Sequence, residues 1–250
     1  MKALVFAAGL GTRLRPLTND RPKALVEVGG VTMLERVLVR LRENGFTDVT
    51  VNIHHFGDKI IGFLSKYDNF GLDIHISDER NLLLDTGGGI LAARRWLDGD
   101  QPFLVHNADI LTDLDLGAFY RSHQGSGALA TLLVKERTTQ RYFVFDDDDR
   151  LQGWINKKTG ETRPDGFRYH PLEQHELAFG GLHVISPDIF PLLERYAAQS
   201  GPVFSITPFY IEVCRQQLIK GYHPNTAYRW LDVGKPETLT QADAMFCNHP

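Results

Sequence analysis

The chain has 250 residues, of which 42% are apolar and 23% are charged, and its formal net charge is −4 at pH 7. This length and composition predict a globular protein with a sizeable core, and the slightly acidic balance indicates neither a nucleic-acid nor an anionic-membrane partner. The two cysteines, Cys214 and Cys247, are far apart and form no CxxC motif, so they predict no disulfide framework and no zinc site and fit a reducing cytosol.

The first half of the chain alternates between strand-like and helix-like segments. Apolar runs predict strands at residues 2–8, 48–53, 72–77, 102–107 and 128–135. Apolar residues at helical spacing predict helices at residues 32–44, 58–67, 87–97 and 116–123, the first with a capping-box pattern of Thr32 and Glu35. The apolar run at the amino end is too short for a signal or membrane segment, so we expect a cytoplasmic protein. The alternation predicts a parallel sheet with helices on both faces and with ligands at the carboxyl ends of the strands.

The pattern changes after residue 135. Residues 142–155 are typical of two short strands around an acidic turn, and residues 156–178 are polar without a clear period. We expect a strand at 178–186, a helix at 205–220, a strand at 228–234 and a closing helix at 236–246. No repeat of about 20–50 residues is present, so we expect a single domain over residues 1–250 whose second half is richer in strands.

Residues 6–25, FAAGLGTRLRPLTNDRPKAL, follow the first strand and combine glycines with basic residues. Their spacing fits neither the Walker loop, GxxxxGK[ST], nor the dinucleotide motif GxGxxG. Gly9 and Gly11 lack the Cβ that would keep an anion away from successive backbone N–H groups. Arg13 and Lys23 add positive charge suited to phosphate oxygens. A surface turn with solvated charges is the alternative, but we interpret the segment as a loop around the phosphates of a nucleoside triphosphate.

Two aspartates at the ends of predicted strands form the second candidate feature. Asp109 follows the strand LVHNA, and Asp232 follows YRWL. Each alone is as often a turn or cap residue. Magnesium, however, prefers hard oxygen ligands, commonly one or two carboxylates together with phosphates and water. Two strand-end carboxylates brought together over a parallel sheet would provide such a site.

The segment AAGLGTRLRPLT…RPKAL resembles the signature of the nucleotidyltransferases that join a nucleoside triphosphate to a sugar 1-phosphate. HNADI and WLDVGKPETL resemble the two metal-aspartate motifs of that family, with Ala108 where glycine is common. The resemblance covers residues 1–135 and 178–245. It implies the α/β nucleotide-diphospho-sugar transferase fold, a Rossmann-like, mixed and mainly parallel sheet flanked by helices, with a small β-rich elaboration on the sugar side. Residues 1–135 would be the nucleotide-binding half and residues 136–250 the sugar-binding half.

The resemblance also implies roles for individual residues. Arg13, Lys23 and Asp109 would be catalytic, and Asp109 and Asp232 would be the ligands of Mg²⁺. The nucleotide contacts would be Ala8, Gly9, Gly11, Thr12, Arg13, Lys23, Glu79, Gly87, Gly88 and Asn107, although a helix-start turn also explains the glycines of the run DTGGGI. The sugar contacts would be Gly180, Gly181 and Lys157. Lys157 stands where relatives often carry a lysine that grips the sugar phosphate, and a solvent-exposed lysine is the alternative.

The implied reaction transfers a nucleotidyl group to a sugar 1-phosphate by Mg²⁺-assisted direct displacement at the α-phosphorus, giving a nucleotide sugar and pyrophosphate. DTGGGI, FGGLHVISP and WLDVGKPETL are most similar to uridylyltransferases for N-acetylmuramate 1-phosphate, then to short mannose- or heptose-1-phosphate guanylyltransferases. Glu79 would suit either a guanine or a uracil edge.

Three different functions are compatible with parts of the same pattern. One is cytidylyl transfer to an alcohol phosphate such as phosphocholine, which would use the same machinery. Another is a glycosyltransferase, although that enzyme would not need the triphosphate loop. The third is a non-catalytic regulatory module that binds nucleotide sugars. For the nucleotidyltransferase we expect the two substrates as partners, no nucleic acid or membrane, and a monomer or small homo-oligomer.

Overall fold

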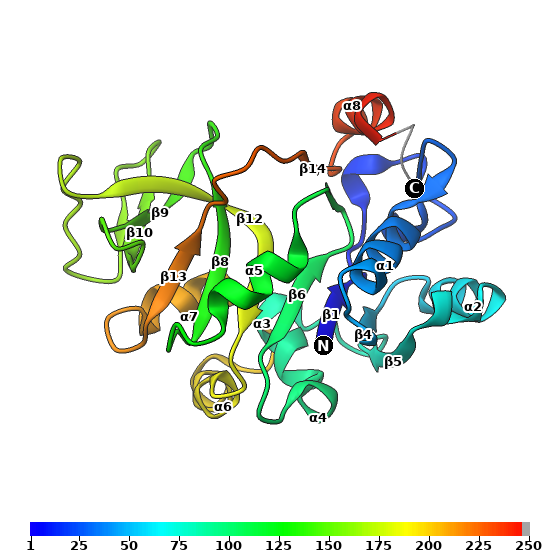
Figure 1. Ribbon diagram of the computed structural model, residues 1–250, viewed down its shortest axis with the longest axis horizontal. Coiled ribbons are helices and arrows are strands. Elements are labelled where there is room, and N and C mark those ends of the chain that lie inside the picture. Colours follow the sequence, from blue (N-terminus) through cyan, green and yellow to red (C-terminus); the bar gives the residue numbers. More distant parts are fainter. Residues whose placement is uncertain (247–250) are drawn as a thin grey trace.

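A mixed sheet of ten strands forms the centre of the computed structural model, which describes residues 1–246 (Figure 1). Cys247 therefore lies outside the described residues. The first half of the chain supplies four parallel strands in the order β6–β1–β4–β5, namely β1 (Lys2–Phe6), β4 (Asp48–Ile53), β5 (Asp73–Asp78) and β6 (Phe103–Asn107). Three of them, β1, β4 and β6, are almost wholly buried, as expected of parallel strands that helices cover on both sides. The predicted alternation of strands and helices is confirmed.

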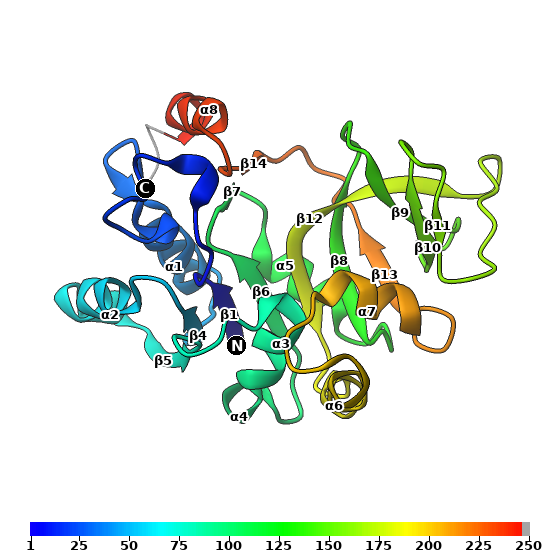
Figure 2. The same ribbon diagram turned by 180° about the vertical axis from the view of Figure 1, so that it is seen from behind.

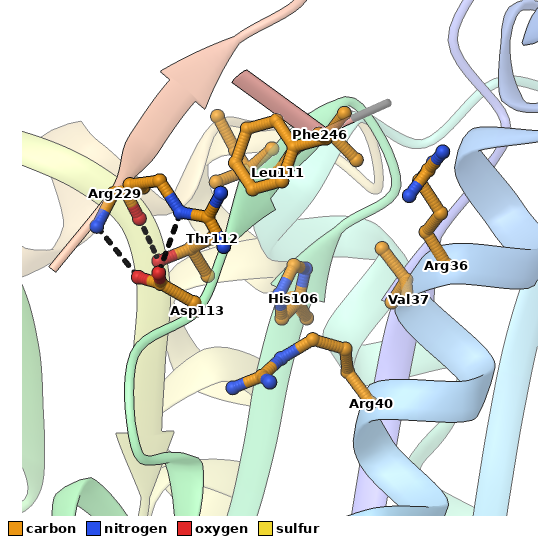
Figure 3. A pocket seen from close by; sticks show the side chains of 10 residues that line it. Arg36, Val37, Arg40, His106, Leu111, Thr112, Asp113, Arg229 and Phe246 are labelled. Atoms are coloured by element: carbon orange, nitrogen blue, oxygen red, sulfur yellow. Dashed lines mark hydrogen bonds and ion pairs between the residues drawn. The ribbon is translucent and has the colours of Figure 1, made fainter. Parts of the chain in front are cut away.

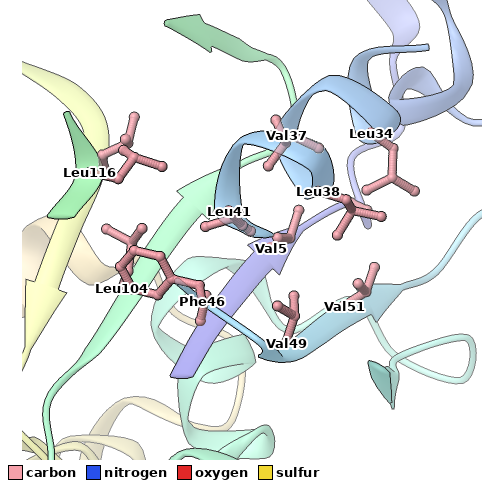
Figure 4. Close-up of a cluster of buried hydrophobic side chains, with 14 of the residues drawn as sticks. Val5, Leu34, Val37, Leu38, Leu41, Phe46, Val49, Val51, Leu104 and Leu116 are labelled. Atoms are coloured by element: carbon pink, nitrogen blue, oxygen red, sulfur yellow. The ribbon is translucent and has the colours of Figure 1, made fainter. Parts of the chain in front are cut away.

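Helices cover both faces because successive side chains of a strand point in opposite directions: Ala3 and Val5 of β1 face one side, and Leu4 faces the other. The first side packs against α1 (Met33–Glu43), α2 (Gly57–Lys66) and α5 (Leu116–His123). Figure 4 shows leucine and valine side chains of α1 packed over Val5 and its neighbouring strands. The second side packs against α3 (Asp85–Ala92), α4 (Arg94–Leu97), α6 (Ile189–Ser200) and α7 (Ile206–Val213), which lie in front in Figure 2.

The second half of the chain adds an antiparallel lobe. The long strand β12 (His175–Ile185) pairs with β6 through its last residues and with β8 (Ala130–Lys135), which in turn pairs with β13 (Ile219–Tyr222). Its first residues pair with β9, and this part of the sheet, here called the β-lobe, consists of β9 (Arg141–Phe145), β10 (Leu151–Asn156) and β11 (Thr162–Arg163). The β-rich elaboration and its two strands within residues 142–155 are therefore confirmed.

The predicted helix over residues 205–220 is wrong in its second half. Helix α7 ends at Val213, and Ile219–Tyr222 form β13. The burial of β13 alternates residue by residue, which is the period of a strand, so burial beside β8 decides its conformation. Helix α6 was not predicted at all. Its first turn contains Pro191, which a helix tolerates there because the first N–H groups need no partner within the helix.

Short elements at one end of the molecule pack between the amino-terminal loop and the last helix. They are the strands β2 (Glu27–Val28), β3 (Val31–Thr32), β7 (Ile110–Thr112) and β14 (Trp230–Asp232), the 3₁₀ turns η1 (Thr12–Leu14) and η2 (Lys23–Leu25), and the helix α8 (Pro236–Phe246). A small hydrophobic cluster joins them, in which Leu14, Val233 and Phe246 are buried. A third 3₁₀ turn, η3 (Asp68–Gly71), follows α2. Within residues 1–246 no helix is both long and apolar enough to cross a membrane.

Candidate active site

A buried asparagine, Asn52, holds the start of the glycine-rich loop where the loop leaves β1. Asn52, at the carboxyl end of β4, accepts hydrogen bonds through Oδ1 from the N–H groups of Ala7 (2.7 Å) and Ala8 (3.1 Å). Its amide donates to Oε1 of Glu79 (2.9 Å). The predicted contact of Ala8 with nucleotide therefore cannot use its N–H group, which is already bonded. Asn52 was not predicted, although a polar residue near the end of an apolar strand was a signal for it.

Beyond Ala8 the loop presents N–H groups that have no protein partner. No residue in the described part of the chain accepts a hydrogen bond from the N–H groups of Gly9, Leu10 or Gly11. The loop nevertheless has a fixed shape, because the carbonyl oxygen of Gly11 accepts from Thr18 Oγ1 (2.8 Å) and from the N–H of buried Leu14 (2.9 Å). Successive free N–H groups on a rigid loop form a concave site for an anion.

Two of the predicted catalytic side chains are in contact. Lys23 Nζ, nearly buried, donates a hydrogen bond to Oδ2 of Asp109, which lies between β6 and β7. The carbonyl oxygen of Asp109 accepts from the N–H of Val233 (2.9 Å), the residue after Asp232. The chain segment that carries Asp232 is thus bonded directly to the residue that was predicted to share a metal ion with it.

Arg13 and Asp232 meet at Gly234. A Cβ added to this glycine would lie 2.9 Å from Asp232 Oδ1 and 3.3 Å from Arg13 Nη2, so both side chains crowd the same position. The structure therefore brings Arg13, Lys23, Asp109 and Asp232 together from the two ends and the middle of the chain.

Asp232 reaches this point from outside the parallel sheet, which corrects the expected arrangement. It ends β14, which pairs antiparallel with β7 so that Asp232 lies opposite Ile110. A second set of bonds holds this pair of strands (Figure 3): Asp113 accepts from the N–H (2.6 Å) and Nε (2.7 Å) of Arg229, and Thr112 Oγ1 donates to the Arg229 carbonyl (2.7 Å). The side chains of Thr112, Asp113 and Arg229 line a small pocket together with His106 and Arg40.

Two carboxylates of the cluster, Asp109 and Asp232, repel each other. Asp232 is exposed, yet protein surrounds it on several sides. This partial removal from bulk water, followed by the negative charge of Asp109, raises the pKa of the Asp232 carboxyl. Lys23, Arg13 and Arg137 act against the rise. Two carboxylates that disfavour each other's charge are a donor set that a cation would stabilise.

A cavity of about 380 Å³ lies beside the cluster and is called the central cavity. Its wall contains the predicted residues Ala8, Gly9, Lys23, Glu79, Asn107 and Asp109, together with Asn52, Asp85, Thr86 and Val203, which were not predicted. Glu79 is only 3% exposed, and its oxygens accept from Asn52 and from the N–H of Leu84 (3.0 Å). Burial raises the pKa of the Glu79 carboxyl. Glu79 therefore supports the wall through bonds within the protein.

The predicted contacts Gly87 and Gly88 do not line the central cavity. Their N–H groups donate to the carbonyl oxygen of Phe204 (2.9 and 3.2 Å), and an added Cβ would collide with the Phe204 ring or with the carbonyl oxygen of Pro202. These glycines let α3 approach the segment after α6, which carries Val203 into the wall.

The predicted sugar contacts lie in three different environments. Gly181 has a φ of +78° at an irregularity in β12, beside Asn107 and Ile110, and so lies next to the cluster. Gly180 packs on Leu133, and its carbonyl oxygen accepts from the indole N–H of Trp230 (2.8 Å). Lys157 follows β10, where its Nζ pairs with Glu176 (2.6 Å). Lys157 borders neither the central cavity nor the larger cavity beside the β-lobe, so the structure does not bring it to the site.

Comparison with known proteins identifies the family of the chain. The family model described as "Nucleotidyl transferase" matches residues 2–248. The chain is 34% identical over 251 residues to the N-acetylmuramate alpha-1-phosphate uridylyltransferase of Caulobacter vibrioides, covering 97% of this chain and 95% of that protein. It is 32% identical to the protein of the same name from Neisseria meningitidis serogroup B, covering 98% of both. The crystal structure of HddC from Yersinia pseudotuberculosis, complexed with GMP-PN, has the same fold, with a TM-score of 0.74, 22% identity and coverage of 98% of this chain and 99% of that chain.

Proposed function

The chain belongs to the nucleotidyl transferase family, and we propose that it transfers a nucleotidyl group from a nucleoside triphosphate to a sugar 1-phosphate. The observation that carries the proposal is the convergence of Arg13, Lys23, Asp109 and Asp232 beside the central cavity. The names of the two relatives make UTP and N-acetylmuramate 1-phosphate the first pair to test. Residues 1–135 would bind the nucleotide and residues 136–250 the sugar, within one domain of a cytoplasmic enzyme.

The loop and its neighbours hold the triphosphate in this proposal. The free N–H groups of Gly9 and Gly11 bind phosphate oxygens, together with the backbone of Thr12. The guanidinium of Arg13 binds the β- and γ-phosphates, and Lys23 binds near the α-phosphate. The base enters the central cavity, whose wall includes Asn107 and the polar side chain of Thr86.

The residues present fit a magnesium ion. Asp109 and Asp232 provide two carboxylates, and no group of three or more His, Cys, Asp or Glu side chains within residues 1–246 could hold a metal ion. A divalent ion with only two protein carboxylates is typical of Mg²⁺, which usually takes its other ligands from phosphates and water. Asp109 and Asp232 would hold the ion, which supplies charge neutralisation between the two phosphate-bearing substrates when bound.

The chemistry requires positioning more than proton transfer. An oxygen of the sugar phosphate attacks the α-phosphorus, a new P–O bond forms, and the bond from the α-phosphorus to the pyrophosphate oxygen breaks. The attacking oxygen is already deprotonated at neutral pH, so no general base is needed. The obstacle is repulsion between two anions, which Arg13 and Lys23 reduce. Loss of either side chain should therefore cost about 3 kcal/mol, or roughly a hundredfold in rate.

The test is a matrix assay with metal-ligand variants. The protein is mixed with Mg²⁺, one of the common nucleoside triphosphates and one of a panel of sugar 1-phosphates, and pyrophosphate release is measured. We expect release with at least one pair, its loss on chelation of Mg²⁺, and a fall of at least about a hundredfold in Asp109→Ala and Asp232→Ala.

Asp100→Ala is the matched control, because this aspartate is exposed and distant from the cluster in the fold. If no substrate pair releases pyrophosphate, the proposed function is wrong. If the double variant of Asp109 and Asp232 keeps wild-type activity, the metal assignment is wrong while the function stands.

A further inference from the structure

Lys157, the cation predicted to bind the phosphate of the sugar, does not lie at the site. Lys157 is engaged by Glu176, and its Nζ also lies 5.4 Å from the centre of the Tyr169 ring. The reaction proposed above still requires a positive group for the phosphate of the sugar, beside the metal ligands, because that phosphate approaches a second anion. Another residue of this chain must provide it.

Arg137 has the required position. It follows β8, and its guanidinium lies 5.6 Å from the centre of the Trp230 ring, two residues before Asp232. The Trp230 ring is itself held in place, since its N–H donates to the carbonyl oxygen of Gly180 (2.8 Å).

Arg137 is also available for a ligand. Its side chain is exposed, and its one hydrogen bond to a described residue is a long one, from Nη2 to the carbonyl oxygen of Phe179 (3.5 Å). Within residues 1–246 no carboxylate forms an ion pair with it. Its planar fork of donors matches phosphate oxygens better than a lysine does, and stacking on Trp230 limits its loss of freedom on binding.

A large cavity, here called the lobe cavity, is lined by Arg137 and by residues of the β-lobe. Its volume is about 1000 Å³. The strand register places Phe143, Trp154 and Arg163 in one row across β9, β10 and β11, and all three line the cavity. Trp154 is half-buried and offers an aromatic surface of the kind on which the C–H face of a sugar packs.

The lobe cavity and the central cavity adjoin. Ser205 lines the first and Thr86 lines the second, and their hydroxyl oxygens are 3.4 Å apart. A ligand in the lobe cavity with its anionic end at Arg137 would lie beside Trp230, two residues before Asp232.

We propose that Arg137 binds the phosphate of the sugar 1-phosphate, while the sugar lies in the lobe cavity over Trp154. The inference rests on the proposed function and assigns to Arg137 the task predicted for Lys157. With two phosphate oxygens held by the guanidinium, the third faces the α-phosphorus of the nucleotide and forms the new bond.

The test is a comparison of Michaelis constants in Arg137→Ala, Arg137→Lys and Lys157→Ala, using the substrate pair found for the wild-type enzyme. Loss of a charged hydrogen-bonding partner predicts that Arg137→Ala raises KM for the sugar 1-phosphate by roughly 10- to 100-fold. KM for the nucleoside triphosphate and the thermal unfolding temperature stay unchanged. Arg137→Lys recovers part of the loss, because it keeps the charge without the fork. Arg195→Ala, an exposed arginine on α6, is the matched control.

Each outcome separates this inference from the proposed function. If the wild-type enzyme is active and Arg137→Ala keeps a wild-type KM for the sugar 1-phosphate, the role of Arg137 is wrong and the function stands. If Lys157→Ala shows the selective rise in KM instead, the original prediction for Lys157 is correct. If Arg137→Ala raises both Michaelis constants equally, Arg137 supports the fold of the site and does not bind the sugar phosphate.

Discussion

Gly9 and Gly11 lie in the same loop, yet the structure requires glycine only at Gly11. Gly11 has a φ of +64°, and an added Cβ would lie 2.9 Å from Thr18 Cγ2 and 3.0 Å from Lys23 Cβ. An added Cβ on Gly9 would meet nothing within 4 Å. The protein itself therefore requires Gly11, whereas at Gly9 only the close approach of the proposed triphosphate would require glycine.

This difference predicts that two alanine substitutions affect different properties, stability in one case and nucleotide binding in the other. Gly11→Ala should lower the free energy of unfolding by about 1–2 kcal/mol, because a side chain disfavours positive φ, and it should also displace Lys23. Gly9→Ala should leave the unfolding temperature unchanged and raise KM for the nucleoside triphosphate. Thermal unfolding and steady-state kinetics of both variants measure the two effects. Equal loss of stability in the two variants would contradict this division.

The motifs predicted the residues that converge, but not the residues that hold them. Arg13, Lys23, Asp109 and Asp232 belong to segments with distinctive chemistry, so sequence alone could select them. Arg137 lies in a segment without a recognisable motif, and only the pairing of β7 with β14 brings Trp230 beneath it. Such a contact depends on tertiary structure and leaves no local pattern.

At the scale of elements, the glycines of α3 determine how closely that helix approaches the segment after α6. A Cβ on Gly88 would lie 2.3 Å from the carbonyl oxygen of Pro202, a backbone atom that cannot rotate away. Gly62, in α2, is a matched contrast, because an added Cβ there would meet nothing within 4 Å and the residue is exposed.

We therefore expect Gly88→Ala to destabilise the protein and Gly62→Ala to stabilise it. Gly88→Ala should lower the free energy of unfolding by about 2–3 kcal/mol through overpacking. Gly62→Ala should raise it by about 0.5–1 kcal/mol, since alanine loses less conformational freedom in a helix. Urea unfolding of the two variants provides the comparison. A tolerated Gly88→Ala would mean that the segment moves freely and does not fix the wall of the central cavity.

Elements with a strong local pattern were predicted closely, and elements decided by packing were not. The strand at residues 48–53 and the helix at 116–123 have the predicted bounds. The capping pattern before α1 was also correct, since Thr32 Oγ1 accepts from the N–H of Glu35 (3.2 Å). In contrast, the sequence of β13 looks like the continuation of the preceding helix, because four residues are too few to show a strand period in the sequence. Only its pairing with β8 identifies it as a strand.

At the scale of the whole molecule, buried histidines link stability to pH. His183 bonds through Nδ1 to the Tyr210 hydroxyl (2.6 Å), and His123 bonds to Thr131 and Ser186; both histidines are buried. Burial lowers the pKa of His183 to about 3 and that of His123 to about 4, from an ordinary value of 6.5. The pKa of His106, a buried residue of β6, is also lowered to about 4 by burial.

These shifts predict a loss of stability in mildly acidic solution. Between pH 6.5 and about 4 the unfolded chain binds protons that the folded protein refuses, so the stabilisation is complete above pH 6.5 and decreases as the pH falls. Each histidine should contribute a loss of about 1.4 kcal/mol at pH 5.5, so the three together account for about 4 kcal/mol. The raised pKa of Glu79 acts in the opposite direction, because its acid form is favoured in the fold.

Urea unfolding at pH 7.5, 6.5 and 5.5 measures this dependence. Because glutamine does not titrate, His183→Gln should make the wild-type decrease between pH 7.5 and 5.5 shallower by one histidine's share, whatever its effect on stability at pH 7.5. His55→Gln, at an exposed position, is the matched control. A decrease of the same slope in His183→Gln would show that other groups cause it. Through this route, activity should decline only at pH values where the unfolding curves show loss of the folded state.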